Sequence, residues 1–134
     1  MGTTILIAED EPYIVESLNF LLSREGHRVV SVNDGAAVLE TVQREKPDLL
    51  VLDVMLPTSN GFEILRQIRN APGFEDLPVL ALTAKGQEAD RKLMLDLGAN
   101  EFVTKPFSNQ DLVDRISGLL AQNSNVTHVA GGHE

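Results

Sequence analysis

Acidic, hydroxyl and ammonium side chains follow four short apolar segments of the chain. The segments at 4–8, 48–52, 78–82 and 101–103 are followed by Glu9-Asp10-Glu11, Asp53, Thr83 and Thr104-Lys105, respectively. If the carboxylates meet, they repel one another, so they either raise one another's pKa or recruit a cation. Mg²⁺ suits such a group, because it takes one or two carboxylates, a carbonyl, waters and a phosphate oxygen. The residues therefore predict either carboxylates with raised pKa values or a divalent-cation site, with a hydroxyl and an ammonium group at the same edge.

The elements that must position these residues alternate along the chain, five times over. Strands are expected at 4–8, 28–32, 48–52, 78–82 and 101–103, where runs too short for helices are rich in Val, Ile and Leu. Between them apolar residues recur at helical spacing. Five βα units predict a parallel sheet covered by helices on both faces, with its carboxyl ends at one edge. Glu9, Asp10 and Asp53 share a pocket there if the first and third strands are neighbours.

Helix-capping residues agree with these boundaries. Pro12 fits a first helical turn, and Asn60 with Glu63, like Ser108 with Asp111, fits a capping box. The helical period stops near Gln122, so we expect one domain over residues 1–122. Residues 123–134 then form a disordered tail or a cloning remnant.

Composition narrows the class of protein. The 134 residues are 43% hydrophobic, contain no Cys and carry a formal net charge of -9. One domain with one sizeable core follows, and a disulfide scaffold or wholesale disorder is excluded. Without a membrane span or a signal pattern, a soluble cytoplasmic protein is expected. The acidity argues against direct nucleic-acid binding, which needs clustered Lys and Arg.

Four motifs, in order and each at the end of an expected strand, resemble the receiver domain of two-component response regulators. The resemblance runs from Thr3 to about Leu120. The motifs are Glu9-Asp10-Glu11-Pro12, Asp53-Val-Met-Leu-Pro57-Thr-Ser-Asn60-Gly61, Leu82-Thr83-Ala84-Lys85-Gly86 and Phe102-Val-Thr-Lys105-Pro106-Phe107.

The resemblance implies a doubly wound, flavodoxin-like α/β fold with strand order 2-1-3-4-5. It also implies that Asp53 takes a phosphoryl group from a histidine kinase or a phosphotransfer protein. Asp10, Asp53, the Met55 backbone carbonyl and Glu9, directly or through water, would hold Mg²⁺. Lys105 and Thr83 would contact oxygens of the phosphoryl group.

The family also implies an output. Thr83 would move toward the phosphoryl group and Phe102 would turn inward, which rearranges the face formed by the fourth helix, fifth strand and fifth helix. A downstream effector protein would bind this 4-5-5 face. The chain would be a signalling domain that catalyses its own phosphorylation and slow dephosphorylation, not a metabolic enzyme. It would be either a stand-alone receiver or a fragment of a longer regulator.

Some positions depart from the commonest family pattern. Glu9 replaces an aspartate, Thr58 stands where glycine is frequent, and Phe102 lacks the hydroxyl of the frequent tyrosine. None of these changes removes a group that the chemistry needs. Met55 and Lys85 are expected to tune the lifetime of the phosphoryl group.

Two other functions compete with this interpretation. A phosphatase of the haloacid-dehalogenase type also uses an aspartyl nucleophile and Mg²⁺, but it usually carries a second acid where Met55 stands here. A receiver-like interaction module that is no longer phosphorylated is the other alternative, and the retention of Asp53, Thr83 and Lys105 argues against it.

A homodimer through the 4-5-5 face is a further expectation. Some receivers pair through ion pairs between subunits, and the matching positions here offer Arg91 with Asp111 and Glu101 with Arg115. Asp96 would meet Ser117, so one familiar pair is missing. Solvent-exposed charges along helices explain the same residues more simply.

Overall fold

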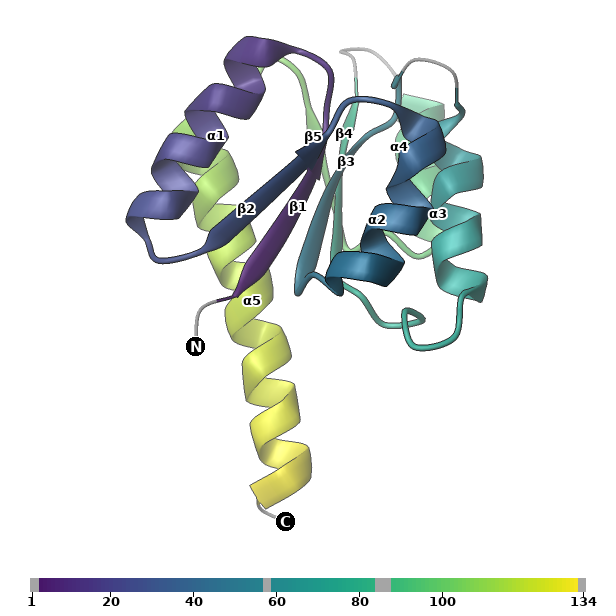
Figure 1. Cartoon of the computed structure of the whole chain (residues 1–134). Helices are drawn as coiled ribbons and strands as arrows, with labels where there is room; N and C mark the ends of the chain where they lie inside the picture. The colour runs from purple at the N-terminus through teal and green to yellow at the C-terminus, as the bar shows by residue number, and fades with distance from the viewer. Residues whose placement is uncertain (1–2, 57–58, 84–87, 133–134) are drawn as a thin grey trace.

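The computed structural model describes residues 3–56, 59–83 and 88–132, and its strands form one sheet between two layers of helices (Figure 1). The expectations that concern Pro57, Thr58 and Lys85 lie outside the described residues. The strands are β1 (Thr4–Ala8), β2 (Arg28–Val32), β3 (Leu49–Asp53), β4 (Val79–Thr83) and β5 (Glu101–Thr104). The helices are α1 (Pro12–Arg24), a short 3₁₀ helix η1 (Gly35–Ala37), α2 (Val38–Glu45), α3 (Gly61–Asn70), α4 (Glu88–Asp96) and α5 (Asn109–Gly132).

The sheet is parallel throughout and has the order β2-β1-β3-β4-β5. This confirms the doubly wound topology that the family resemblance implies. Ile7 pairs with Val51 and Ala8 with Leu52, so the first and third strands are neighbours. The condition for a shared acidic pocket is therefore met.

Alternating residues of the central strands belong to two separate hydrophobic cores, one on each face of the sheet. In β1, Leu6 and Ala8 face the core under α2, α3 and α4, whereas Ile5 and Ile7 face the core under α1 and α5. β3 and β4 alternate in the same way and are buried along their whole length. Figure 1 shows α1 and α5 on one side of the sheet and the other three long helices on the opposite side. Burial on both faces explains why these strands are continuous apolar runs.

Capping residues begin the helices where the sequence predicts. Pro12 lies in the first turn of α1, and the Asn60 side chain accepts a hydrogen bond from the Phe62 amide. Ser108 Oγ accepts from the Asp111 amide at the start of α5. The third and fourth strands begin and end one residue later than predicted, because Asp53 and Thr83 still belong to the ladder. Two functional side chains thus sit on rigid strand ends.

Arg69 forms hydrogen bonds to the two loops that precede β4 and β5, at the amino-terminal edge of the sheet. Arg69 donates hydrogen bonds to the carbonyl oxygens of Phe74, at 3.0 Å, and Gly98, at 2.7 Å. Gly98 has a φ of +111°, and a Cβ on it would lie 2.8 Å from Arg69 Nε. Arg69 therefore binds the turn that follows α4, close to the carboxyl end of that helix, where a cation is favoured.

The last helix continues beyond the expected end of the domain. α5 runs to Gly132, and Figure 1 shows its final turns extending away from the sheet and the other helices. Helical backbone thus covers much of the segment that the sequence predicts as a disordered tail, and the domain boundary at residue 122 stays a prediction. No helix in the described part of the chain is long and apolar enough to cross a membrane.

Truncation of a central core residue should cost much of the stability of this fold. Leu50 is fully buried in β3, so Leu50→Ala should lower the free energy of unfolding by about 3 kcal/mol. Leu93→Ala is the matched control, because Leu93 is 44% exposed on α4. Its cost should stay below about 1 kcal/mol. Urea unfolding measures both, and equal losses would contradict the assignment of the core.

Candidate functional site

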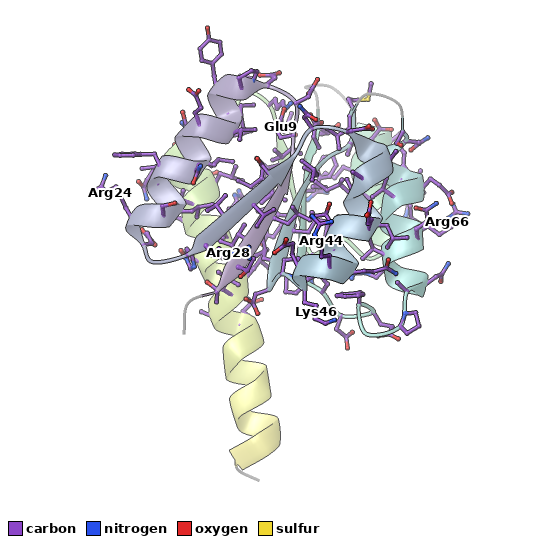
Figure 2. All side chains as sticks on the ribbon, viewed as in Figure 1. Glu9, Arg24, Arg28, Arg44, Lys46 and Arg66 are labelled. Atoms are coloured by element: carbon purple, nitrogen blue, oxygen red, sulfur yellow. The ribbon has the colours of Figure 1, made fainter. Side chains whose placement is uncertain are left out.

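The carboxyl ends of four strands bring the predicted site residues to one edge of the sheet. Glu9 directly follows β1, Asp53 and Thr83 end β3 and β4, and Lys105 directly follows β5. The backbone bonds continue past the strands, since the Lys105 amide donates to the Thr83 carbonyl at 2.7 Å. Figure 2 shows Glu9 at the end of the sheet where the strand arrows point. The side chains therefore project from a fixed frame.

Three carboxylates meet at this edge. Glu9, Asp10 and Asp53 each offer an oxygen, and these oxygens lie within 4.8 Å of one another. Glu9 and Asp53 are buried, whereas Asp10 is exposed. One side of the cluster is thus closed by protein and the other is open to solvent, as an ion that arrives from water requires.

Lys105 supplies the positive charge beside these acids. Its Nζ lies 3.1 Å from Asp53 Oδ2 and 3.3 Å from Glu9 Oε2. Burial acts to lower the pKa of Lys105, but the hydrogen bond with Asp53 and the charges of Glu9 and Asp53 outweigh it, so the pKa is raised. Lys105 is therefore a permanent cation at neutral pH.

Glu9 is held by one oxygen only. Its Oε2 accepts from the Glu11 amide at 3.0 Å and from Lys105, whereas Oε1 is buried and has no hydrogen-bond partner among the described residues. Burial, followed by repulsion from Asp53, raises the pKa of Glu9 to about 7. A buried carboxylate oxygen without a donor is costly. A cation next to Oε1 would remove that cost.

Thr83 presents a second buried oxygen in the same state. The residue is 1% exposed, and its hydroxyl has no hydrogen-bond partner among the described residues. Phe102, on the neighbouring strand β5, is half-buried and packs against the core under α2, α3 and α4. The threonine thus has hydrogen-bonding capacity to offer to a group that arrives at the site.

Backbone amides and one further carboxylate complete the site. The Met55 amide donates to Asp53 Oδ1 at 2.9 Å, and the Met55 side chain is 68% exposed. Glu11 Oε2 lies 3.6 Å from Lys105 Nζ. From the sequence, Glu11 could be identified only as one of three consecutive acidic residues. Its contact with Lys105, which follows a strand at the edge of the sheet, could not be predicted.

The donor set fits a hard divalent cation. Glu9, Asp10 and Asp53 offer oxygen ligands alone, as Mg²⁺ prefers, and Glu9 Oε1 has no hydrogen-bond partner within the described part of the chain. Among the predicted site residues, Glu9, Asp10, Asp53 and Lys105 lie together, and Thr83 ends a strand at the same edge of the sheet, whereas Phe102 packs against the core.

Comparisons with known proteins agree with this geometry. A profile of the response regulator receiver domain matches residues 5–117. The chain is 42% identical over 123 residues to the alkaline phosphatase synthesis transcriptional regulatory protein PhoP of Bacillus subtilis, which covers 92% of this chain and 50% of that protein. The chain thus spans about half the length of this curated relative.

Solved structures give the same result. The receiver domain of the sensor histidine kinase PA1611 from Pseudomonas aeruginosa, with a magnesium ion in its active site cleft, is 30% identical with a TM-score of 0.80, over 90% of this chain and 99% of that one. The BeF₃-activated receiver domain of Klebsiella pneumoniae RstA is 30% identical with a TM-score of 0.77, over 87% and 97%.

Fold, acidic edge and relatives together define a signalling domain of two-component systems. The chain belongs to the response regulator receiver domain family.

The raised pKa of Glu9 predicts a pH-dependent stability. Between its ordinary value of 4.5 and about 7, Glu9 keeps its proton in the folded state but loses it in the unfolded state. This contribution to stability is present below pH 4.5 and is lost as the pH rises through 7. In EDTA, the stability of the wild type relative to Glu9→Gln should therefore fall by up to about 3 kcal/mol across this range.

Urea unfolding at pH 4.5, 6 and 8 measures this difference. Glu11→Gln is the matched control, because the Glu11 side chain belongs to the same loop and is 57% exposed. A difference between wild type and Glu9→Gln that stays constant with pH would contradict the prediction.

Proposed function

We propose that Asp53 accepts a phosphoryl group in a two-component phosphorelay. The contact of Lys105 Nζ with Asp53 Oδ2, at 3.1 Å within the acidic cluster, carries this proposal. A carboxylate that faces a lysine can receive an anionic group, since the cation offsets the repulsion.

The proposed reaction is an in-line displacement at phosphorus. An oxygen of Asp53 forms the new P–O bond while the P–N bond of a phosphohistidine breaks, and the histidine nitrogen keeps the bonding electron pair and takes a proton from water. With acetyl phosphate, a P–O bond breaks instead and acetate leaves. Lys105 stabilises the charge that spreads over the phosphoryl oxygens.

A magnesium ion would be held by Glu9, Asp10, Asp53 and the backbone carbonyl of Met55. When bound, it would neutralise charge on the phosphoryl oxygens. The oxygen-only cluster and the magnesium in the cleft of the PA1611 receiver support this assignment. Glu9 reaches Lys105 as well, so its longer side chain would serve both cations.

Thr83 and Phe102 would convert phosphorylation into a change of surface. The Thr83 hydroxyl, which has no hydrogen-bond partner among the described residues, would donate to a phosphoryl oxygen, and Phe102 would turn inward behind it. The phosphoryl group would stabilise this rearranged state only to the extent that it interacts more favourably with the rearranged state than with the resting state.

The partners would be a sensor histidine kinase or a phosphotransfer protein and, at the 4-5-5 face, a downstream effector, in the cytoplasm. Two exposed large apolar residues follow site residues closely in the chain: Met55, 68% exposed, comes two residues after Asp53, and Tyr13, 83% exposed, comes two residues after Glu11. They offer contact area to a protein that presents its phosphohistidine to Asp53.

Acetyl phosphate tests the proposal directly. With Mg²⁺, the intact mass of the wild type should rise by one phosphoryl group, and neither Asp53→Asn nor an EDTA-treated sample should gain it. Lys105→Met should slow phosphorylation by about a hundredfold, because it removes the cation at the phosphoryl oxygens. Lys92→Met is the matched control, since the Lys92 side chain is 80% exposed on α4.

Two outcomes would overturn the assignment. A wild type that gains no phosphoryl group would leave a receiver-like interaction module, and an equal gain in Asp53→Asn would place the acceptor elsewhere.

We also propose that the phosphorylated chain forms a homodimer through the 4-5-5 face. Within one chain, Arg115 already bonds Glu101 at 2.9 Å and Asp111 at 3.1 Å. A dimer would exchange these exposed contacts for equivalent ones across the interface.

Light scattering with beryllofluoride and Mg²⁺ should therefore show dimers for the wild type and fewer for Arg115→Ala. Arg24→Ala, on α1, is the control. A wild type that stays monomeric with the phosphoryl mimic would contradict this assembly.

A further inference from the structure

A buried glycine from outside the site touches the loop that follows Asp53. The name phosphoacceptor loop is used here for its described residues, Val54 to Leu56 together with Ser59 and Asn60. Gly35 is the first residue of η1, between β2 and α2, and it is buried. A Cβ on Gly35 would lie 2.4 Å from Ser59 Cβ and 2.9 Å from Ser59 Oγ. No real side chain could occupy that space unless the loop moved.

Contact, not backbone conformation, requires glycine at this position. The described glycines with positive φ are Gly26, Gly73 and Gly98, and Gly35 is not among them. Any residue could adopt the Gly35 backbone angles, so the close approach to Ser59 is what excludes a side chain.

The turn that carries Gly35 is itself held firmly. The Asp34 side chain accepts from the Ala36 amide at 3.0 Å, and the Ala37 amide donates to the Asp34 carbonyl at 3.0 Å. Just before it, the Val32 carbonyl accepts from the Glu9 amide at 3.1 Å. The turn is therefore a fixed support beside the first strand.

The phosphoacceptor loop closes tightly at its own ends. The Gly61 amide donates to the Val54 carbonyl at 3.2 Å, and a Cβ on Gly61 would lie 2.7 Å from Val54 Cα. Between these ends, the Met55 amide bonds Asp53 Oδ1 at 2.9 Å. Gly61 lies two residues after Ser59, and its bond joins it to the residue before Met55. A displacement of Ser59 would therefore reach Met55 and Asp53 through these two hydrogen bonds.

We infer that Gly35 is a positioning residue of the phosphoacceptor loop, whose missing side chain lets the β2–α2 turn support Ser59 and so fixes Met55 beside Asp53. This rests on the proposed function of Asp53. The support comes from an element that contributes no side chain to the chemistry.

Gly35→Ala tests the inference. The two Cβ atoms must separate by about 1 Å to reach ordinary van der Waals contact, and displacement on that scale costs up to about a hundredfold in rate. We expect phosphorylation by acetyl phosphate to slow at least tenfold, and the amide resonances of Val54, Met55 and Gly61 to shift. Gly118→Ala is the matched control, because a Cβ there meets no atom within 4 Å.

Second-site changes separate positioning from loss of fold. Ser59→Gly added to Gly35→Ala removes the colliding Cβ and should restore both rate and resonances, whereas Ser59→Ala keeps that Cβ and should restore neither. Should Gly35→Ala fail to fold, Ser59→Val adds bulk to the same contact from the loop side and should slow phosphorylation in its place.

Several results would overturn the inference. The first is a folded Gly35→Ala or Ser59→Val variant with the wild-type phosphorylation rate and unshifted amide resonances. The second is equal rescue of Gly35→Ala by Ser59→Gly and Ser59→Ala. The third is a Gly35→Ala variant whose melting temperature falls while its phosphorylation rate does not change. If the wild type itself is not phosphorylated, the proposed function fails, and the resonances still decide whether Gly35 positions the loop.

Discussion

The site depends on the repulsion between two buried carboxylates that are held side by side. Glu9 and Asp53 extend neighbouring strands, so the ladder between β1 and β3 prevents them from moving apart. Lys105, brought from the far edge of the sheet, offsets part of this repulsion. Burial, followed by the repulsion from Asp53 that remains, raises the pKa of Glu9. The negative charge that Lys105 does not neutralise requires a bound cation or a proton on a carboxylate. Either can enter from solvent on the side where Asp10 is exposed.

The location of many site residues at one edge of the sheet could be predicted from the sequence, because the fold repeats the same βα unit. Each βα unit repeats one geometry, so a polar residue after any apolar run must fall at the same edge as the others. Four motifs therefore located Asp53, Thr83, Lys105 and the acidic run without knowledge of their contacts. Strand order came from the family resemblance, because the apolar pattern of a buried strand does not say which strand lies beside it.

Other contacts were beyond prediction because they are set by distance across the fold. Glu11 could be recognised as an acid, but only the path of Lys105 over the sheet makes it a neighbour. In the sequence, Arg69 resembles an ordinary residue of a helix surface, and only the fold brings the Gly98 carbonyl, in the turn after α4, within hydrogen-bond distance. Gly35 reads as a turn glycine, and only the approach of Ser59 shows that the space for a Cβ is already taken. Such constraints depend on which loops meet, and periodicity does not determine that.

The two buried oxygens without partners show how this edge differs from the rest of the core. Elsewhere, Thr41 lies buried with its hydroxyl bonded to the Ala37 carbonyl, as buried polar groups generally are. Thr83 Oγ1 and Glu9 Oε1 lack such bonds among the described residues, and both lie at the carboxyl edge with Asp53. Burial without a partner destabilises the resting domain, so any ligand that satisfies both oxygens gains that free energy on binding. In the proposed function, a phosphoryl group with its cation would supply an acceptor for the hydroxyl and a positive charge for the carboxylate. If the proposed function holds, these two oxygens would contribute to the affinity for the phosphoryl group, and they would bias a two-state switch only as far as the two states satisfy them differently.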